Sequence, residues 1–341
     1  MKIRMEQTKK HLVVAAMRNE GPFILEWVAW YKMLGFDDVL VVTNDCTDHS
    51  EALLKLLQDE GWLSHAAHSP KPGQPPKKSA HMTALAHPLV QACDWMFLCD
   101  IDEFLVFHQG DGTVQGFLGN DEPDIAGIAI HWKCFGSSGQ KTWADSWVHQ
   151  TYQRAAATHT TANTFFKSLV YKPARYQKLG AHSPRQFPGQ WGEKPNVWVD
   201  GAGRIMGNFH PNTNPKQMTR PDLVTHANAQ VNHYIIRADE CFEFKRGRPS
   251  ASALKDRYSD DFRTKYDGND ETDDIALAFS EDVADIYAEL AAIPGVMRLH
   301  HLCCADFVQA MCLKRGDDPH EDARYRHHMA AAERLENERS G

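Results

Sequence analysis

The sequence predicts an α/β fold, with a mostly parallel sheet covered by helices on both faces and a helical C-terminal extension. Short apolar runs alternate with helical patterns over residues 11–99, which is typical of such a sheet. Polar clusters follow several of these runs, and helical periodicity dominates after residue 275. The chain has 341 residues, of which 42% are hydrophobic, enough for one large domain or two modest ones.

The first predicted strand is HLVVAAM (11–17). A helix then opens at Gly21-Pro22, where a first-turn proline costs little, and Gly35 ends it. Further strands are predicted at VLVVT (39–43), WMFLC (95–99), and around 125–135, 165–171 and 230–236. Further helices are predicted behind a capping box at Asp48 and Glu51, after the loop 69–78, and over 282–292 and 297–314, with a charged linker at 249–274.

Composition narrows the class of protein. The net charge of −8 argues against a nucleic-acid-binding protein, which usually has a basic excess. Eight cysteines without a CxxC pair are interpreted as reduced thiols. No signal peptide or membrane span is evident, so we expect a cytoplasmic protein without a transmembrane segment, with peripheral membrane contact left open.

Three polar clusters follow predicted strands: Asn19-Glu20, Asn44-Asp45 and Asp100-Ile101-Asp102. In parallel α/β sheets ligands bind beyond the carboxyl ends of the strands, so we expect these clusters to converge on one edge. Carboxylates such as Asp100 and Asp102 are hard ligands suited to Mn²⁺ or Mg²⁺, and a bound metal can neutralise charge on a departing diphosphate. The alternative is a solvated acidic turn, since a bare DxD match is common.

Several ordered motifs together resemble the GT-A (Rossmann-like) glycosyltransferases, in the group related to families 2 and 92. They are Asn19-Glu20, Glu26-Trp27, Gly35-Phe36, Asn44-Asp45, Thr47-Asp48, DIDEF (100–104), HWKCFGSSG (131–139), FKSLVYKP (166–173), GAHSP (180–184) and NHYIIRADECFEFKRGR (232–248). The resemblance implies a catalytic domain over residues 11–250, with 275–341 as the helical extension. It also implies a nucleotide-diphosphate sugar donor, Mn²⁺ or Mg²⁺, and transfer of a hexose to a hydroxyl of a glycan or glycoconjugate acceptor, in glycan or surface polysaccharide synthesis.

The resemblance also implies roles for individual residues. Asn19, Glu20 and Asp45 match positions that hold the nucleoside, a role that suits hydrogen-bond acceptors; their alternative role is helix capping and turn formation. Asp100 and Asp102 match the metal motif. Lys78 is predicted to pair with phosphate as a point charge, or else to be a solvated lysine.

A third metal ligand is expected from the later half of the chain, and neutral imidazole is suitable. His233 is preferred over His182, which is kept as a nucleotide-sugar-binding candidate. Lys245 and Arg248 are predicted to contact the diphosphate or the acceptor, unless the run KRGR is only a solvated helix face.

An inverting transfer needs a carboxylate to accept the proton of the acceptor hydroxyl. Glu240 is predicted for this role, and Asp102 is the other catalytic candidate through the metal. Glu243, Asp145 and Asp200 are alternatives for the base. Acidic residues near Asp239 could equally be ordinary first-turn partners of a helix dipole.

The segment HHLCC (300–304), with Cys312 nearby, invites a zinc interpretation. Adjacent His-His or Cys-Cys pairs do not easily all face one ion, and structural zinc sites usually combine spaced ligands. The surrounding pattern favours a buried amphipathic helix instead, in which the cysteines act as small apolar residues.

Two other functions compete with glycosyl transfer. A haloacid-dehalogenase-like phosphatase also places DxD after a buried strand, with Asp273-Asp274 as a later acidic pair. Its nucleophile lies on the first strand, however, whereas here about ninety residues precede the motif. A non-catalytic carbohydrate-binding protein would use the nine tryptophans for stacking and the acids for Ca²⁺.

Overall fold

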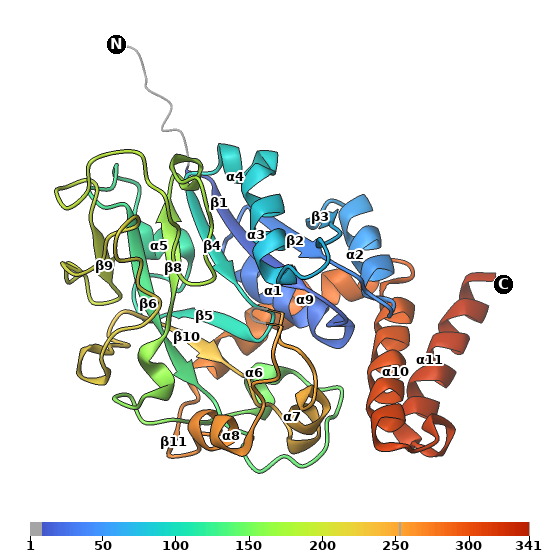
Figure 1. The fold of residues 1–341 in the computed structure, drawn as a ribbon. Helices are drawn as coiled ribbons and strands as arrows, with labels where there is room; N and C mark the ends of the chain where they lie inside the picture. The colour runs from blue at the N-terminus through green and yellow to red at the C-terminus, as the bar shows by residue number, and fades with distance from the viewer. Residues whose placement is uncertain (1–8, 252–253, 341) are drawn as a thin grey trace.

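A computed structural model describes residues 9–251 and 254–340 (Figure 1). Its large sheet has the order β3-β2-β1-β4-β8-β6-β10-β5, with β9 paired to β6. The strands are β1 His11–Met17, β2 Asp38–Thr43, β3 Ser64–Ala67, β4 Trp95–Cys99, β5 Glu103–Phe107, β6 Gly127–Cys134, β8 Phe166–Tyr171, β9 Trp198–Asp200 and β10 Ala229–His233. Two short strands, β7 Arg154–Ala155 and β11 Glu271–Thr272, form a separate antiparallel pair.

The helices follow the strands in the expected alternation over the first hundred residues. They are η1 Gly21–Phe23, α1 Ile24–Met33, α2 Ser50–Asp59, α3 Pro76–Ala86, α4 Pro88–Ala92, α5 Val114–Leu118, α6 Val148–Thr151, η2 Ala162–Thr164, η3 Pro173–Arg175, η4 Pro221–Leu223, α7 Asp239–Lys245, α8 Asp260–Tyr266, η5 Ile275–Phe279, α9 Ser280–Ala292, α10 Val296–Arg315, η6 Pro319–Glu321 and α11 Ala323–Ser340.

The sheet separates two apolar layers. Successive side chains of β1 point to opposite faces, as strand geometry requires, so Val13 and Ala15 join one core while Leu12 and Val14 join the other. The first core is covered by α1 and α2, and the second by α3 and α4. Five of the eight strand pairings in the sheet are parallel. The predicted fold class, a mostly parallel α/β sheet with helices on both faces, is therefore confirmed.

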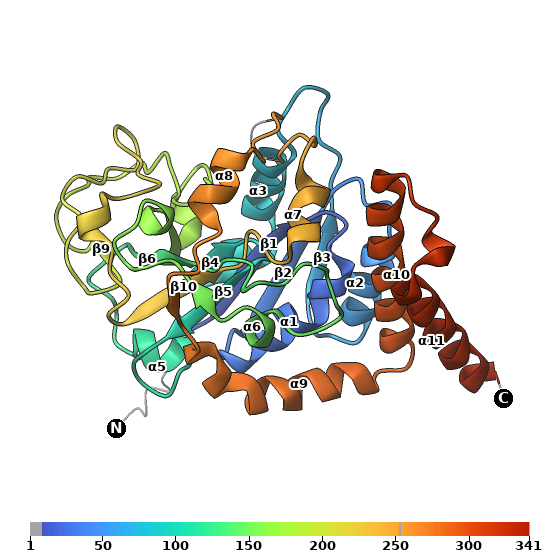
Figure 2. The same cartoon turned by 90° about the horizontal axis from the view of Figure 1, so that it is seen from below.

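The C-terminal part is helical, as expected. Helix α9 lies along α1, and α10 and α11 form a hairpin at the side of the sheet (Figure 2). Helix α10 also packs closely against η1, where a Cβ on Gly21 would lie 2.4 Å from the Cβ of Cys303. Only glycine therefore lets the hairpin approach the turn that follows Asn19 and Glu20.

The structure corrects the sequence analysis in three places. The charged segment 249–274 contains helix α8, whose N-cap is Ser259. Residues 103–107 form a strand, β5, that was not predicted, so Asp100 and Asp102 lie in the turn between β4 and β5. The capping box is only half formed: Asp48 bonds to Ser50, but Glu51 accepts a hydrogen bond from the Thr43 hydroxyl instead.

Two expectations about the whole chain can be compared with the described residues. All eight cysteines are unpaired in the structure. Among the described helices, none is both long and apolar enough to cross a membrane.

Candidate active site

The predicted polar clusters do meet at one edge of the sheet. Strands β1, β2 and β4 run parallel and end there, at Asn19-Glu20, Asn44-Asp45 and Asp100. Strand β8 is antiparallel to β4, so its start brings Lys167 to the same edge. The parallel pairing of β10 with β6 ends at His233, which lies opposite Glu103 on the other side.

Asp100 is held by two lysines. The ammonium of Lys77 lies 2.5 Å from its carboxylate, and that of Lys167 lies 3.1 Å away. Burial opposes ionisation of Asp100, but the charges of Lys167 and Lys77 outweigh it and hold its pKa well below the usual range. Asp100 is therefore an anion at neutral pH.

Glu103 is a third member of this network and contacts both Asp100 and Lys167. Its Oε2 accepts a hydrogen bond from the Asp100 backbone N–H at 2.7 Å and lies 3.0 Å from the Lys167 ammonium. The side chain is fully buried, and burial raises its pKa to about 8. Burial therefore disfavours the ionised form of Glu103, while the nearby Lys167 ammonium opposes this effect.

Asp102 lies beside His233 and Lys245. Its Oδ1 is 3.7 Å from the His233 Nε2, and its Oδ2 is 3.8 Å from the Lys245 ammonium. Burial lowers the pKa of His233 to about 3, so its imidazole is neutral and has a free lone pair at neutral pH. The ring packs on Trp132, with centroids 4.0 Å apart. A carboxylate and a neutral imidazole nitrogen in this position fit a divalent transition metal such as Mn²⁺.

Arg237 brings a further cation to this edge. Its guanidinium stacks on the Phe23 ring at 3.5 Å and lies 3.6 Å from the Glu20 carboxylate. Burial nevertheless raises the pKa of Glu20, against the opposing effect of Arg237 and Lys245. Arg237 itself is 3% exposed and has a left-handed φ of 57°, an uncommon conformation for a long side chain.

Asn19 and Asp45 occupy turns, as their alternative role predicts. Both have left-handed backbone conformations, with φ of 55° and 46°. The Asn19 carboxamide bridges to Thr47, accepting from its backbone N–H at 2.8 Å and donating to its hydroxyl at 2.9 Å. Among the described residues, the exposed Asp45 carboxylate accepts a hydrogen bond from the neighbouring Asn44 amide alone, at 3.0 Å. Of the two side chains, Asp45 is the one with spare capacity for a ligand.

Three further predicted residues make contacts with groups other than Asp100 and Asp102. The Nδ1 of His182 is hydrogen-bonded to the Phe166 carbonyl, 2.9 Å away. The His182 ring packs edge to face against the Trp132 ring. Lys78 is exposed, and its neighbour Lys77 makes the contact with Asp100. Arg248 stacks on Phe244 at 3.8 Å.

Glu240 lies in the first turn of α7, as the alternative to its catalytic role predicts, and its carboxylate is bound by arginines. Both of its oxygens accept hydrogen bonds from Arg324 on α11, at 2.7 and 3.0 Å, and one accepts from the Trp143 backbone N–H at 3.0 Å. A further ion pair joins it to Arg315. Burial opposes ionisation, but these donors lower the pKa of Glu240. A carboxylate with both oxygens engaged and a lowered pKa is poorly suited to accept a proton.

The alternative bases are also engaged elsewhere. Asp200 accepts from the Arg204 side chain at 2.7 Å, Asp145 lies against His300, and Glu243 pairs with Arg246 on its own helix.

Three cations at this edge were not predicted from the sequence: Lys77, Lys167 and Arg237. The sequence did contain a signal for Lys167, because this residue is the second of β8 and belongs to the family-like segment FKSLVYKP. Choosing Lys77 over Lys78 required the phase of helix α3, which starts only at Pro76. Arg237 lies in an irregular segment after β10, where no periodicity indicates direction.

Comparison with known proteins gives relatives of one kind. A glycosyltransferase family 92 protein of Ricinus communis is 25% identical over 147 residues, covering 41% of this chain and 25% of that protein. One of Oryza sativa subsp. japonica is 27% identical over 130 residues, covering 38% of this chain and 22% of that protein. The chain thus spans about a quarter of the length of these curated relatives.

Among solved structures, S. aureus TarS 1–349 is 11% identical, with 89% of this chain and 81% of that chain covered and a TM-score of 0.34. The same TarS fragment in complex with UDP-GlcNAc gives 12% identity over the same coverage and a TM-score of 0.32. The sequence family is much more specific: the model of glycosyltransferase family 92 matches residues 14–263. Since this match covers more than half of the 341 residues, the chain belongs to glycosyltransferase family 92.

Proposed function

We propose that this chain transfers a hexose from a nucleotide-diphosphate sugar to a hydroxyl group of a glycan or glycoconjugate, in glycan or surface polysaccharide synthesis. The observation that carries the proposal is the pairing of Asp102 with a neutral His233, beside the cations Lys77, Lys167 and Lys245 at the edge where β1, β2 and β4 end. Family membership makes a sugar transfer more consistent with this site than the phosphatase alternative.

The divalent metal belongs to this proposal. Asp102 and His233 would hold Mn²⁺ or Mg²⁺, and Asp100 would contribute if a lysine gave way. A nitrogen ligand favours Mn²⁺ over Mg²⁺, which prefers oxygen. When bound, the metal would neutralise charge on the departing diphosphate.

The protein's own side chains would bind and orient the donor. Lys77 and Lys245, whose side chains are partly exposed, supply positive charge at this edge, while the buried Lys167 holds Asp100 in place. Positive charge at this edge attracts a diphosphate. Asp45, with free acceptor capacity at the end of β2, would accept hydrogen bonds from the nucleoside.

The stereochemistry is proposed as inverting, the outcome for which a carboxylate base was sought in the sequence. Glu240 is not retained as the proton acceptor, because Arg324 and Trp143 occupy its oxygens. A cytoplasmic location likewise stays a prediction.

The test measures thermal stabilisation by UDP, GDP and CMP, with and without Mn²⁺, followed by donor hydrolysis and transfer. A ligand at a hundred times its dissociation constant should add about 2.7 kcal/mol of stability. We expect one nucleoside diphosphate to stabilise the protein in a Mn²⁺-dependent way. Asp102→Ala should abolish this effect and the turnover of the donor, while the melting temperature without ligand stays nearly unchanged.

The matched control is Asp124→Ala. Asp124 is 65% exposed, and its carboxylate pairs with Lys194, which lies 70 residues later in the sequence. It should leave both readouts intact. Turnover that survives in Asp102→Ala would refute the metal site. Sugar binding without any hydrolysis of a nucleotide sugar would instead favour the carbohydrate-binding alternative.

A further inference from the structure

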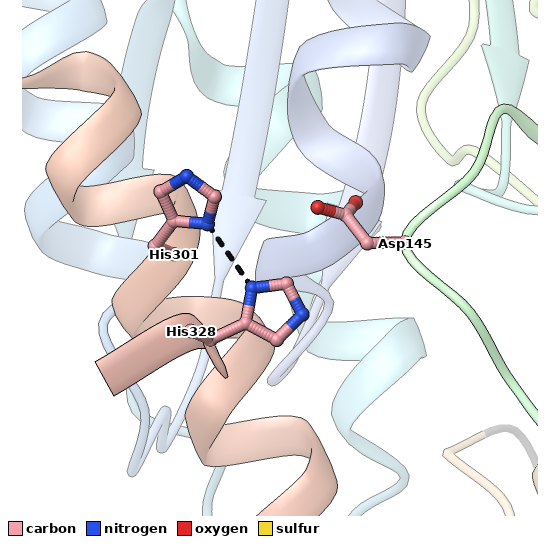
Figure 3. A group of neighbouring side chains, drawn as sticks. All are labelled: Asp145, His301 and His328. Carbon is pink, nitrogen blue, oxygen red and sulfur yellow. Dashed lines mark hydrogen bonds between the residues drawn. The ribbon is translucent and has the colours of Figure 1, made fainter. Parts of the chain in front are cut away.

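A second group of metal-ligating side chains lies between the C-terminal hairpin and the loop before α6. It consists of Asp145, His301 on α10 and His328 on α11, and we refer to it as the hairpin cluster (Figure 3). One ligand atom from each residue lies within 4.8 Å of the other two. The Nδ1 atoms of His301 and His328 are 3.0 Å apart. These ligands come from three separate segments, which the spacing of HHLCC could not reveal.

The structure confirms that 297–314 lies in a helix, yet the two adjacent histidines serve different neighbours. His301 faces His328 across the hairpin. His300 instead points to Asp145, with its Nε2 at 3.1 and 3.2 Å from the two carboxylate oxygens. The objection that adjacent histidines cannot share one ion is therefore met, because only one of them belongs to the hairpin cluster.

The donor types of the cluster suit zinc. Two imidazoles and one carboxylate supply the nitrogen and oxygen donors that zinc binds.

The spacing of the two imidazole nitrogens also fits. Zinc–nitrogen bonds of about 2.0–2.1 Å in tetrahedral geometry place two ligand atoms about 3.4 Å apart. The observed Nδ1–Nδ1 separation of 3.0 Å needs only a small outward movement of the rings. His301 is half-buried and His328 is buried, so the cluster combines an enclosed side with access from solvent.

We propose that Asp145, His301 and His328 form a zinc site that fastens the α10–α11 hairpin to the catalytic part of the chain. His300 acts as a positioning residue, because it orients the Asp145 carboxylate in the way that outer-shell partners orient metal ligands. The fourth zinc ligand would be water.

A second combination, Asp145 with His300 and Cys304, is less suitable. Burial raises the pKa of the Cys304 thiol well above its usual value, whereas zinc binds the thiolate. In this combination His300 and Cys304 both lie on α10 and no ligand comes from α11. An ion bound there would therefore not join α11 to the rest of the chain.

The position of the hairpin gives the site a consequence. Helix α10 packs on η1 through Cys303 against Gly21 and through the ring of Phe307 against that of Phe23, 5.6 Å apart. The turn at Asn19 and Glu20 directly precedes η1. A metal that holds α10 and α11 together would therefore stabilise the support of one end of the proposed nucleotide site.

The experiment titrates Zn²⁺ into untagged protein in excess Mg²⁺ and measures stoichiometry and affinity by calorimetry. The Asp102→Ala background removes the proposed catalytic metal site, so the result does not depend on the proposed function. We expect one equivalent of zinc to bind and to raise the melting temperature. His328→Ala should weaken binding by more than about 100-fold, and His300→Ala by about 10–100-fold.

The matched control is His327→Ala, on the same helix and exposed, which should leave zinc affinity unchanged. If His328→Ala does not fold, His301→Gln at a half-buried position gives the same test. X-ray absorption of the zinc-loaded protein should show nitrogen and oxygen neighbours at about 2.0–2.1 Å and no sulfur at about 2.3 Å. Absence of binding, equal loss in His327→Ala, or a sulfur neighbour would each overturn the proposal.

Discussion

Replacing Glu240 by glutamine separates its two roles, structural clamp and catalytic base. In the structure Glu240 joins α7 to the C-terminal hairpin through Arg324 and Arg315, and to the Trp143 backbone. The Glu240→Gln variant keeps the shape of the side chain but removes its charge. One amide oxygen remains to accept a hydrogen bond, so the paired bonds from Arg324 cannot both persist.

The expected loss of stability follows from exposure. Glu240 is 10% exposed and Arg324 25%, so their paired hydrogen bonds contribute about 2 kcal/mol, within the range for charged groups. Arg315 is 41% exposed, and solvent screening limits its share to at most about 1 kcal/mol. The free energy of unfolding should fall by about 3 kcal/mol in total. At about 2 °C per kcal/mol for a long chain, the melting temperature should fall by about 6 °C.

The assay combines thermal unfolding with donor turnover and transfer, measured well below the melting temperature of the variant. Glu243→Gln is the matched control, because Glu243 lies on the same helix, is 54% exposed and pairs only with Arg246 among the ion pairs of the described residues. It should leave both stability and activity nearly unchanged. For Glu240→Gln we expect a lower melting temperature with less than about a tenfold change in transfer.

The opposite pattern would refute this reasoning. Loss of a general base costs about 10²–10⁴-fold in rate. If Glu240→Gln lost transfer on that scale, kept donor binding and melted normally, Glu240 would be the base despite its two arginines. The engaged oxygens would then have to be freed when substrate binds.

Two further predictions concern charge. Lys77→Ala should raise the KM for the donor by about tenfold or more, because it removes a charged partner of the diphosphate. Lys78→Ala, at the exposed neighbouring position, should leave the KM unchanged. Equal effects of the two variants in steady-state kinetics would contradict the assignment of Lys77. Burial lowers the pKa of His131 to about 4 and of His226 to about 3, so between pH 6.5 and 4 the unfolded chain binds protons that the folded one does not. Stability should therefore fall as pH drops below 6.5, by up to about 2 kcal/mol per histidine at pH 5. Urea unfolding at pH 7 and 5 tests this, and His131→Gln should reduce the difference; an unchanged difference would show that His131 does not contribute.

The sequence by itself determined the parallel half of the sheet and the edge where the polar clusters meet. Apolar runs such as His11–Met17 and Trp95–Cys99 bury both faces, and this pattern is local and readable. The polar residues that follow them must lie at the same edge, because parallel strands end together. Asp102 and His233 could be paired in advance because the family motifs carry both.

Only the tertiary structure decided which charges partner these residues. Lys77, not the predicted Lys78, pairs with Asp100, because neighbouring residues of a helix point in different directions. Which of them faces the site depends on where α3 begins, and packing decides this. Glu240 has a structural role because Arg324, which lies 84 residues later on α11, binds its carboxylate. The hairpin cluster formed for the same reason: its ligands are distant in sequence, and only packing of α10, α11 and the Asp145 loop brings them together.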